Sequence, residues 1–434
     1  MPLVKDLEIK RAVVLMGPRR VGKTVMLYHT VQELINKGIN PRKICFITVE
    51  TPIFNGINLD QLLKYALEAS GLKNEEEMYI FFDEIQYLKE WELHLKSLVD
   101  SYRNYKFVAS GSAAAALKYK SMESGAGRFT DFLLPPLAFC EYMAFQAHES
   151  FTKEKNDFDP SNDINELNKH FINYINYGGY PEAVFSKDIQ ENPGRFIRQD
   201  IIDKVLLRDL PSLYGIRDVQ ELNSLFTMIA YNSGNEFSLE ALSQQSGGVS
   251  KHQIKIYLEY LESAFLIKMV RRIDQGGKRF QRDNFFKIYL TNPSLRSALF
   301  SPLSATDDFI GNMVETAIYA QWMHLLDFTP WYARWASGEV DIAGLNPLTL
   351  KPIWAVEIKW SNQFFNSPKK LKSLLKFCHM NKLTNAEVTT IDKSEIKTIN
   401  NIEIEFVPAA VYAYAIGNSA IRSNHPSKPG IPSR

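Results

Sequence analysis

Cysteine is scarce in this chain, which has three among its 434 residues: Cys45, Cys140 and Cys378. Because they lie far apart and in no metal-like spacing, they argue against a disulfide framework and predict a reduced, cytoplasmic protein with buried thiols. The sequence also lacks an apolar run long enough to cross a membrane, and no signal-peptide core follows Met1. We therefore expect no membrane partner.

The chain also has no large excess of positive or negative charge, since 50 Lys and Arg balance 49 Asp and Glu. Any binding of nucleic acid must therefore come from local patches. We find no internal repeat and no low-complexity tract. The length allows two to four domains, each with enough apolar residues for its own core.

What the sequence does contain is a phosphate-binding loop near its start, Gly-Pro-Arg-Arg-Val-Gly-Lys-Thr at 17–24. An apolar run at 12–16 precedes it, and apolar residues at helical spacing follow it up to Gly38. The two glycines would let backbone N–H groups point at phosphate oxygens, and the helix N-terminus adds partial positive charge. We expect Lys23 to contact the β- and γ-phosphates and Thr24 to bind Mg²⁺. The predicted nucleotide-binding residues are Gly17, Pro18, Arg19, Arg20, Val21, Gly22, Lys23, Thr24 and Val25.

An apolar strand at 78–82 ends in two carboxylates, Asp83 and Glu84. Asp83 is expected to hold Mg²⁺ through water, because this small cation keeps most of its own waters. Glu84 is placed to polarise the attacking water as a general base. An acidic pair at a strand end is otherwise a solvated turn, and it is the loop at 17–24 that favours catalysis here.

Further strands are expected at 44–49, 107–110 and 129–134, completing a parallel sheet. Ser110 or Ser112 would follow one of them as a sensor of the γ-phosphate. Arg128 offers a cation that could reach a nucleotide in cis or from a neighbouring subunit, as an arginine finger. The alternative is a surface arginine paired with an acidic side chain.

Changes of composition divide the rest of the chain. Helices are expected at 139–147, 167–177 and 195–209, the last ended by Pro211, with an exposed linker at 148–165 and a disordered tail at 418–434. The predicted domains are a nucleotide domain at 1–147, a helical connector at 148–215, a winged helix-turn-helix at 216–292, a nuclease-like domain at 293–417 and the tail.

The region from 218 to 292 has the pattern of a winged helix-turn-helix. Three helices, the second and third capped by Ser238 and Ser250, precede two strands at 266–273 and 285–291. Such a third helix can enter a major groove while cations of the wing contact phosphates. Winged helices also bind proteins, so DNA contact is one of two alternatives. The cations expected to face outward are Lys251, His252 and Lys255 on the helix, and Arg271, Arg272, Lys278, Arg279 and Arg282 on the wing.

Carboxylates gather again near the end of the chain. A helix is expected at 311–325, with Glu315 at the edge of its apolar stripe. The segment that ends in Asp341 leads into a strand, and strand alternation puts Glu357 and Lys359 on one face of the next. Carboxylates that hold Mg²⁺ beside a lysine that orients the nucleophile are what metal-assisted phosphodiester cleavage requires. The alternatives are a simple salt bridge and an inactive core that only binds.

The chain resembles the prokaryotic AAA-type ATPases fused to a C-terminal domain of unknown function, a large family of bacteria and archaea. The matching stretches follow the family's order over nearly the whole chain. They read GPRRVGKT at 17–24, FFDEIQ at 81–86, ASGS at 109–112, GR at 127–128, PPLAFCEY at 135–142, GGYPE at 178–182, GEVD at 338–341 and VEIK at 356–359.

The resemblance implies an ATPase with an extra strand between the Walker A and Walker B strands and a catalytic glutamate. It also implies a winged helix and a restriction-endonuclease-like fold of the PD-(D/E)xK kind. The matching residues are Lys23 and Thr24 for phosphate and Mg²⁺, Asp83 and Glu84 for the Walker B pair, and Glu315, Asp341, Glu357 and Lys359 for the nuclease core. Members of the family have a longer segment before the first strand, which leaves the adenine contacts undefined here.

The sequence thus predicts an α/β protein: a P-loop NTPase parallel sheet, then a helical winged-helix region, then an α/β restriction-endonuclease-like domain. Its cofactors would be ATP and Mg²⁺, and its partners DNA and further copies of itself. The leading hypothesis is an ATP-hydrolysing protein that acts on DNA through the winged helix and nuclease-like domain. The alternative is a nucleotide-controlled switch or scaffold that binds DNA or a protein and cuts nothing.

Overall fold

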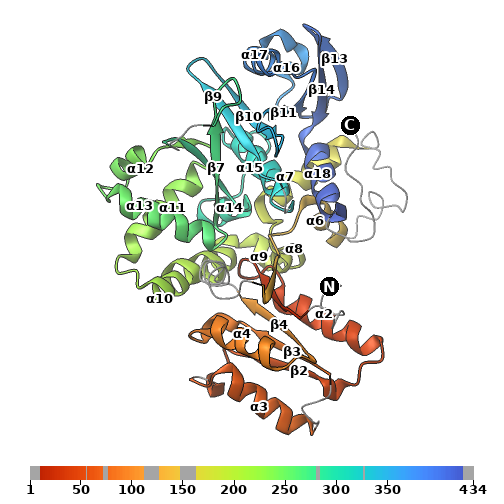
Figure 1. Cartoon of the computed structure of the whole chain (residues 1–434). Coiled ribbons are helices and arrows are strands. Elements are labelled where there is room, and N and C mark those ends of the chain that lie inside the picture. Colours follow the sequence, from red (N-terminus) through yellow and green to blue (C-terminus); the bar gives the residue numbers. More distant parts are fainter. Residues whose placement is uncertain are drawn as a thin grey trace. The chain divides into compact units, whose positions relative to one another are not determined.

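The structure, a computed structural model, describes residues 10–54, 56–71, 77–111, 127–146, 163–279, 284–325 and 328–423 (Figure 1). It divides into two compact units, each described separately below. The first unit comprises Met1–Pro135, Asp203–Arg217 and Glu259–Phe265, and the second unit comprises the remainder. In these described ranges, no helix has the length and apolarity needed to cross a membrane.

The first unit is built on a five-stranded parallel sheet in the order β2-β3-β4-β1-β5. The strand β4 lies between β1, which leads into the phosphate-binding loop, and β3, which ends at Asp83. The predicted strands are therefore confirmed, with small changes at their ends. The bounds are β1 Ala12–Met16, β2 Ile44–Thr48, β3 Met78–Asp83, β4 Tyr105–Gly111 and β5 Phe129–Leu133.

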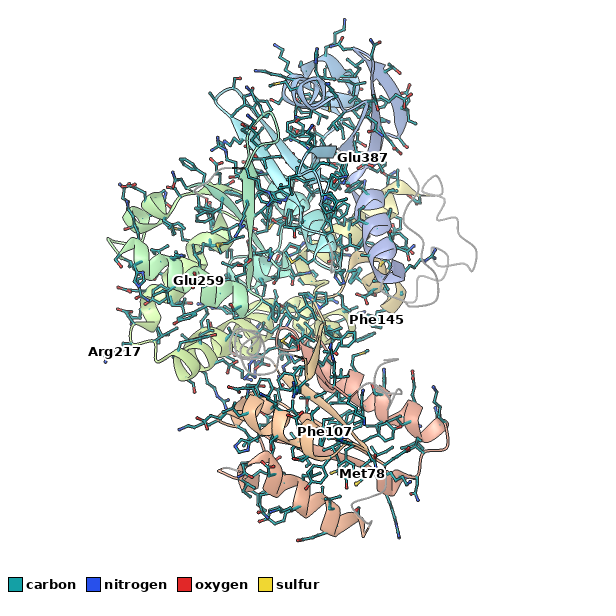
Figure 2. All side chains as sticks on the ribbon, in the orientation of Figure 1. Met78, Phe107, Phe145, Arg217, Glu259 and Glu387 are labelled. Atoms are coloured by element: carbon teal, nitrogen blue, oxygen red, sulfur yellow. The ribbon has the colours of Figure 1, made fainter. Side chains whose placement is uncertain are left out.

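Helices cover both faces of this sheet because its strands carry apolar side chains on both sides. One core cluster joins α3 (Leu59–Ser70) and α4 (Trp91–Ser101) to alternate strand residues such as Met78 and Phe107 (Figure 2). A second cluster packs Leu27 and Leu34 of α2 against the opposite face. The unit also contains α2 (Lys23–Asn36) and three short 3-10 turns, η1 (Pro41–Lys43), η2 (Pro52–Phe54) and η3 (Ile85–Tyr87).

The helix expected at 195–209 differs from the prediction. It consists of π-helical turns, η5 (Gly194–Asp203) and η6 (Val205–Asp209), and it runs on into α10 (Leu210–Tyr214). Pro211 therefore does not end the helix. It lies at the second residue of α10, directly after the π-helical turns, and the chain stays helical through it as far as Tyr214.

The second unit contains a nine-stranded sheet in the order β13-β14-β12-β11-β10-β9-β7-β8-β6. The strands β7 and β9 pair in parallel, so the sheet runs through the predicted boundary at 292/293 without a break. The five predicted domains remain predictions. The bounds are β6 Glu236–Phe237, β7 Ile267–Ile273, β8 Phe286–Leu290, β9 Trp331–Trp335, β10 Gly338–Leu345, β11 Pro352–Glu357, β12 Asn385–Thr390, β13 Glu395–Ile399 and β14 Ile402–Pro408.

One core of the second unit lies among α6, α7, α15 and α18, which come from widely separated parts of the chain. The other helices cover the sheet or connect its strands. The bounds are α6 Phe139–Phe145, α7 Ile164–Tyr177, α8 Pro181–Phe185, α9 Lys187–Glu191, α11 Val219–Tyr231, α12 Leu239–Gln245, α13 Lys251–Ser263, α14 Ser294–Leu299, α15 Ile310–Trp322, α16 Gln363–Asn366, η7 Pro368–Lys370, α17 Lys372–Asn381 and α18 Ala409–Ser423.

Two predicted irregular segments are corrected in part. The helix α18 includes residues 418–423 of the expected tail, and Ala420 in that stretch is fully buried. The expected linker ends earlier than predicted, because α7 begins at Ile164, with the Asp163 side chain accepting a hydrogen bond from the Glu166 N–H. The remaining parts of both predictions, 424–434 and 148–162, lie outside the described residues.

Candidate nucleotide site and carboxylate centre

The phosphate-binding loop connects β1 directly to α2. Gly22 caps the helix with φ 96°, a left-handed conformation that favours glycine. A Cβ atom on Gly17 would lie 2.2 Å from the carbonyl oxygen of Leu134, so this position admits no side chain. The loop encloses Lys23, whose ammonium donates to the carbonyl oxygens of Gly17 at 3.1 Å and Pro18 at 2.7 Å. The backbone therefore surrounds the one ammonium that was predicted to contact phosphate.

Lys23 is buried, with 4% of its surface exposed. Removal from water lowers the pKa of its ammonium to about 8, while the negative charge of Glu84 opposes that shift. A buried cation with a lowered pKa is a group whose charge lacks a partner. An anionic phosphate would supply that partner.

The predicted Mg²⁺ residues lie together at the ends of β3 and β4. The Thr24 hydroxyl donates to Asp83 Oδ2 at 2.8 Å, and the Ser110 hydroxyl donates to Asp83 Oδ1. Ser110 Oγ also accepts a hydrogen bond from the backbone N–H of Glu84 at 3.2 Å. Ser110 thus links the Asp83 carboxylate to the backbone of Glu84, while Ser112, the other predicted sensor, lies outside the described residues.

Glu84 adopts a left-handed backbone conformation, with φ 56° and ψ 48°. This conformation costs a non-glycine residue about 1–2 kcal/mol and concentrates at functional sites. The amide of Gln86 donates to the Glu84 carboxylate and orients it. Sequence reasoning did not assign this role to Gln86.

Arg19 has a partner that sequence reasoning missed. Its Nε donates to Asp209 Oδ2 at 2.6 Å and its Nη2 to Asp209 Oδ1 at 2.9 Å, with a further bond to the Tyr87 hydroxyl at 3.1 Å. Burial alone would lower the pKa of Arg19, but the hydrogen bonds and charge of Asp209 raise it above its usual value. The Arg19 side chain therefore holds the loop to η6, a segment 190 residues away in sequence.

Arg128 does not serve the phosphate site in cis. It precedes β5, where Ala12 pairs with Phe129, whereas the phosphate-binding loop begins beyond Met16, which pairs with Leu133. Five strand residues separate the two edges by about 16 Å. The Arg128 Nε donates to Asp100 Oδ1 at 3.0 Å, the surface pairing that was the alternative. The cis role is therefore wrong, and a role in a neighbouring subunit remains a prediction.

The second unit brings Asp341, Glu357 and Lys359 together, because β10 and β11 pair antiparallel with Ile342 opposite Val356. The Lys359 ammonium lies 3.1 Å from Asp341 Oδ2, 2.8 Å from Glu357 Oε1 and 2.9 Å from the carbonyl oxygen of Ile358. The backbone N–H of Ile358 also donates to Asp341 Oδ2 at 2.8 Å. Three oxygens thus converge on one positive charge.

Glu357 is the anomalous member of this group. Burial and the nearby charge of Asp341 raise its pKa to about 8, although Lys359 opposes the shift. Its second oxygen, Oε2, is buried and has no hydrogen-bond partner among the described residues. For Asp341, burial acts to raise the pKa, but the ammonium groups of Lys359 and Lys287 outweigh it and lower that pKa.

Glu315 is bound by two residues of β8 that sequence reasoning did not single out. Its Oε1 accepts from the Lys287 ammonium at 2.9 Å and from the Tyr289 hydroxyl at 2.6 Å. Lys287 also pairs with Glu339 at 2.6 Å. Over the described ranges, no three His, Cys, Asp or Glu side chains are arranged to hold a metal ion. The oxygens around the Lys359 ammonium instead come from two carboxylates and one backbone carbonyl.

Two family models match parts of the chain. Residues 9–143 match an AAA domain. The five-stranded parallel sheet, with its extra strand between β1 and β3, agrees with this match to an AAA domain. Residues 168–307 match a domain of unknown function, DUF8612, which crosses the predicted boundaries at 215/216 and 292/293.

Two sequence relatives each match a longer part of this chain than either family model does. An uncharacterized protein of Haemophilus influenzae is 26% identical over 65% of this chain and 68% of its own length. The uncharacterized protein MJ1544 of Methanocaldococcus jannaschii is 29% identical over 66% of this chain, and the match spans 62% of that relative, less than two thirds.

Solved structures overlap this chain only loosely. The Walker-type ATPase PABY2304 of Pyrococcus abyssi is 17% identical with a TM-score of 0.40, covering 68% of this chain and 93% of that one. The ORC1 protein of Aeropyrum pernix in complex with DNA is 12% identical with a TM-score of 0.31, covering 69% and 90% respectively.

Proposed function

We propose that this protein hydrolyses ATP and acts on DNA through its second unit. The observation that carries the ATPase part is the connected set Thr24, Asp83, Ser110 and Glu84 beside the buried ammonium of Lys23. This set fits a magnesium nucleotide, because a hydroxyl and a carboxylate that already touch can share one cation. When bound, Mg²⁺ would neutralise charge that develops on the phosphates.

The chain's own residues would then divide the work. Backbone N–H groups of residues 19–22 and the Lys23 ammonium bind and position the phosphates. Thr24 and Asp83 hold the cation. Glu84 accepts the proton of the attacking water; Gln86 orients its carboxylate, and Ser110 Oγ holds its backbone N–H.

A lysine exchange tests the ATPase directly. We expect Lys23→Ala to lower ATP turnover by about 100-fold or more, since it removes the ammonium from the developing charge. Lys37→Ala is the matched control, because Lys37 is an exposed lysine just past the same helix. Equal turnover by wild type and Lys23→Ala would end this proposal.

DNA contact is proposed first for the region 218–290. The order α11, β6, α12, α13, β7, β8 with antiparallel β6-β8-β7 pairing supports the proposal of a winged helix-turn-helix. Lys251, His252 and Lys255 are exposed at the start of α13, and Lys278 is exposed after β7. Arg272 is a correction, because it points inward to the Arg334 carbonyl oxygen at 3.0 Å and to Glu236 at 3.4 Å. Arg282 lies outside the described residues.

A basic groove on the same unit adds support. It measures ≈ 520 Å³ and is lined by Lys369, Lys372, Leu375, Lys376, His379, Met380, Asn400 and Ile402. No carboxylate lines it, although the whole chain has nearly equal numbers of acidic and basic residues. A groove with three lysines and no acid suits a phosphate backbone.

The carboxylate centre fits a proposal of metal-assisted phosphodiester cleavage. Asp341, Glu357 and the Ile358 carbonyl would hold one divalent ion at the position that the Lys359 ammonium now takes. The buried Glu357 Oε2, which has no hydrogen-bond partner among the described residues, would then gain a cation as its partner. Such an ion would activate water and neutralise the leaving oxygen. Lys359 would move outward and orient the nucleophile. Glu315, predicted as a further ligand, would act through Lys287 and Tyr289.

A second candidate function, a switch or scaffold that cuts nothing, is favoured by one observation. Lys287 and Lys359 already neutralise much of the carboxylate charge. One assay matrix separates the two functions: ATP turnover and nicking by wild type, Lys23→Ala, Asp341→Ala and Lys359→Ala on branched, duplex and single-stranded DNA. Nicking that needs Mg²⁺ or Mn²⁺ and is absent from both carboxylate-centre variants supports cleavage. Retained DNA binding with no nicking by any variant supports the scaffold.

A further inference from the structure

Lys287 is a lysine enclosed by three carboxylates. Only 3% of its side chain is exposed, and its ammonium lies 2.9 Å from Glu315 Oε1, 2.6 Å from Glu339 Oε1 and 3.7 Å from Asp341 Oδ1. A buried ammonium is strongly unfavourable unless it is paired and hydrogen-bonded. The Lys287 ammonium is therefore stable in this buried position only because the carboxylates of Glu315, Glu339 and Asp341 surround it.

The alternation of β8 explains how a lysine reaches this place. Every residue of the strand is buried, and Lys287 and Tyr289 project to the same side, where both contact Glu315 of α15. The ring of Tyr332 lies 5.5 Å from the Lys287 ammonium and closes off another direction. The ammonium on β8 is thus enclosed by residues of α15, β9 and β10, and only 3% of the Lys287 side chain is exposed.

Asp341 lies between two ammonium groups. Its Oδ1 faces Lys287 at 3.7 Å and its Oδ2 faces Lys359 at 3.1 Å. In centres that use two divalent ions, a carboxylate bridges the two cations in this way, with the ions about 3.5–4 Å apart. The two lysines differ in freedom, however, since Lys359 is 28% exposed and Lys287 is enclosed. Only the position of Lys359 can be vacated for an ion.

We propose that Lys287 is a built-in cation that takes the place of a second divalent ion, so that the carboxylate centre accepts one metal ion and not two. This inference rests on the proposed metal centre and specifies its stoichiometry. It also assigns Glu315 and Glu339 to the lysine and only Asp341 and Glu357 to the metal. Lys287 is a positioning residue in this account, because it acts on the reacting atoms through Asp341.

Metal stoichiometry tests the proposal without any measurement of cleavage. Mn²⁺ binding to the full chain is measured by calorimetry and by the electron paramagnetic resonance of free Mn²⁺, without nucleotide and in an Asp83→Asn background that silences the other site. We expect one Mn²⁺ per chain, lost in Asp341→Asn. Lys287→Met, which keeps a long unbranched side chain but removes the charge, is expected to bind two. Lys106→Met is the control for loss of a buried lysine elsewhere, and it should still bind one.

The outcomes distinguish this inference from the proposed function. No Mn²⁺ in the Asp83→Asn protein would overturn both the metal centre and this inference. One ion in both that protein and its Lys287→Met derivative, or two in both, would overturn the role of Lys287 alone. If Lys287→Met does not fold, the pair Glu315→Gln and Glu339→Gln decides: stoichiometry and affinity for one ion should hold within about threefold, whereas loss of an ion would show that those carboxylates bind metal.

Discussion

The exchange Gly17→Ala gives a sharp test of the phosphate-binding loop. The added Cβ would lie 2.2 Å from the Leu134 carbonyl oxygen, a separation that Cβ atoms essentially never show. The atom it meets is backbone, and the adjacent Leu134 N–H is already bonded to the Met16 carbonyl oxygen at 2.7 Å. Because β5 cannot yield, the loop must retreat by about 1 Å to restore ordinary contact.

A retreat of that size moves the donors that cradle phosphate. A misplacement of about 1 Å can lower a rate by about 10²-fold, and overpacking costs about 1–3 kcal/mol of stability. We therefore expect Gly17→Ala to fold, to bind magnesium nucleotide more weakly and to hydrolyse ATP about 100-fold more slowly. Steady-state turnover and the Kd of a fluorescent nucleotide measure both effects.

The matched control is Gly311→Ala on α15, where no atom lies within 4 Å of the new Cβ. Its helical position predicts a neutral effect or a gain of up to about 1 kcal/mol. Turnover and affinity of Gly17→Ala within about twofold of wild type would refute the account of the loop.

Three further predictions concern stability and reactivity. Asp209→Ala leaves the partly buried Arg19 guanidinium without its carboxylate and should lower the free energy of unfolding of the first unit by about 3 kcal/mol. Asp100→Ala breaks the exposed pair with Arg128 and should lower it by less than about 1 kcal/mol. Equal shifts in the urea midpoint of the two variants would contradict this. Burial lowers the pKa of His324 to about 4, below its value in the unfolded chain. As the pH falls, His324 therefore takes up a proton in the unfolded chain before it does so in the folded protein. Up to about 3 kcal/mol of the stability present at neutral pH should be lost between about pH 6.5 and 4. Thermal unfolding of His324→Leu should lack that loss. Burial raises the pKa of both Cys140 and Cys378 to about 12, so these two buried thiols should react with a disulfide reagent at neutral pH only after denaturation. Rapid labelling of either thiol in the folded protein would count against its burial, whereas Cys45 is partly buried and should react first.

The sequence predicted the elements of the first unit well because their signals are local. An apolar run, a glycine-rich loop and helical spacing lie within about thirty consecutive residues. The Asp83-Glu84 pair lies at the end of the apolar strand β3. The side-by-side placement of Thr24, Asp83 and Ser110 then follows from parallel strands that end at one edge.

Contacts between distant segments escaped prediction. Nothing near Arg19 indicates that Asp209 is its partner, and a lone lysine in an apolar strand gives no sign that Lys287 meets Glu315 of a later helix. Arg128 was misjudged for a related reason. Its motif gives a residue type, whereas its distance from the phosphate loop depends on the direction and register of β5.

The composition of the first unit from three stretches of chain has a consequence for biosynthesis. Because residues 203–217 and 259–265 complete it, the ribosome must synthesise the chain through residue 265 before this unit can close. Until then the nascent N-terminal segment carries Arg19 with no counter-charge and an uncovered apolar surface that Phe265 later packs against. A recombinant fragment that stops at residue 147 should for the same reason be prone to aggregate, whereas one that continues through residue 265 includes every stretch of the unit.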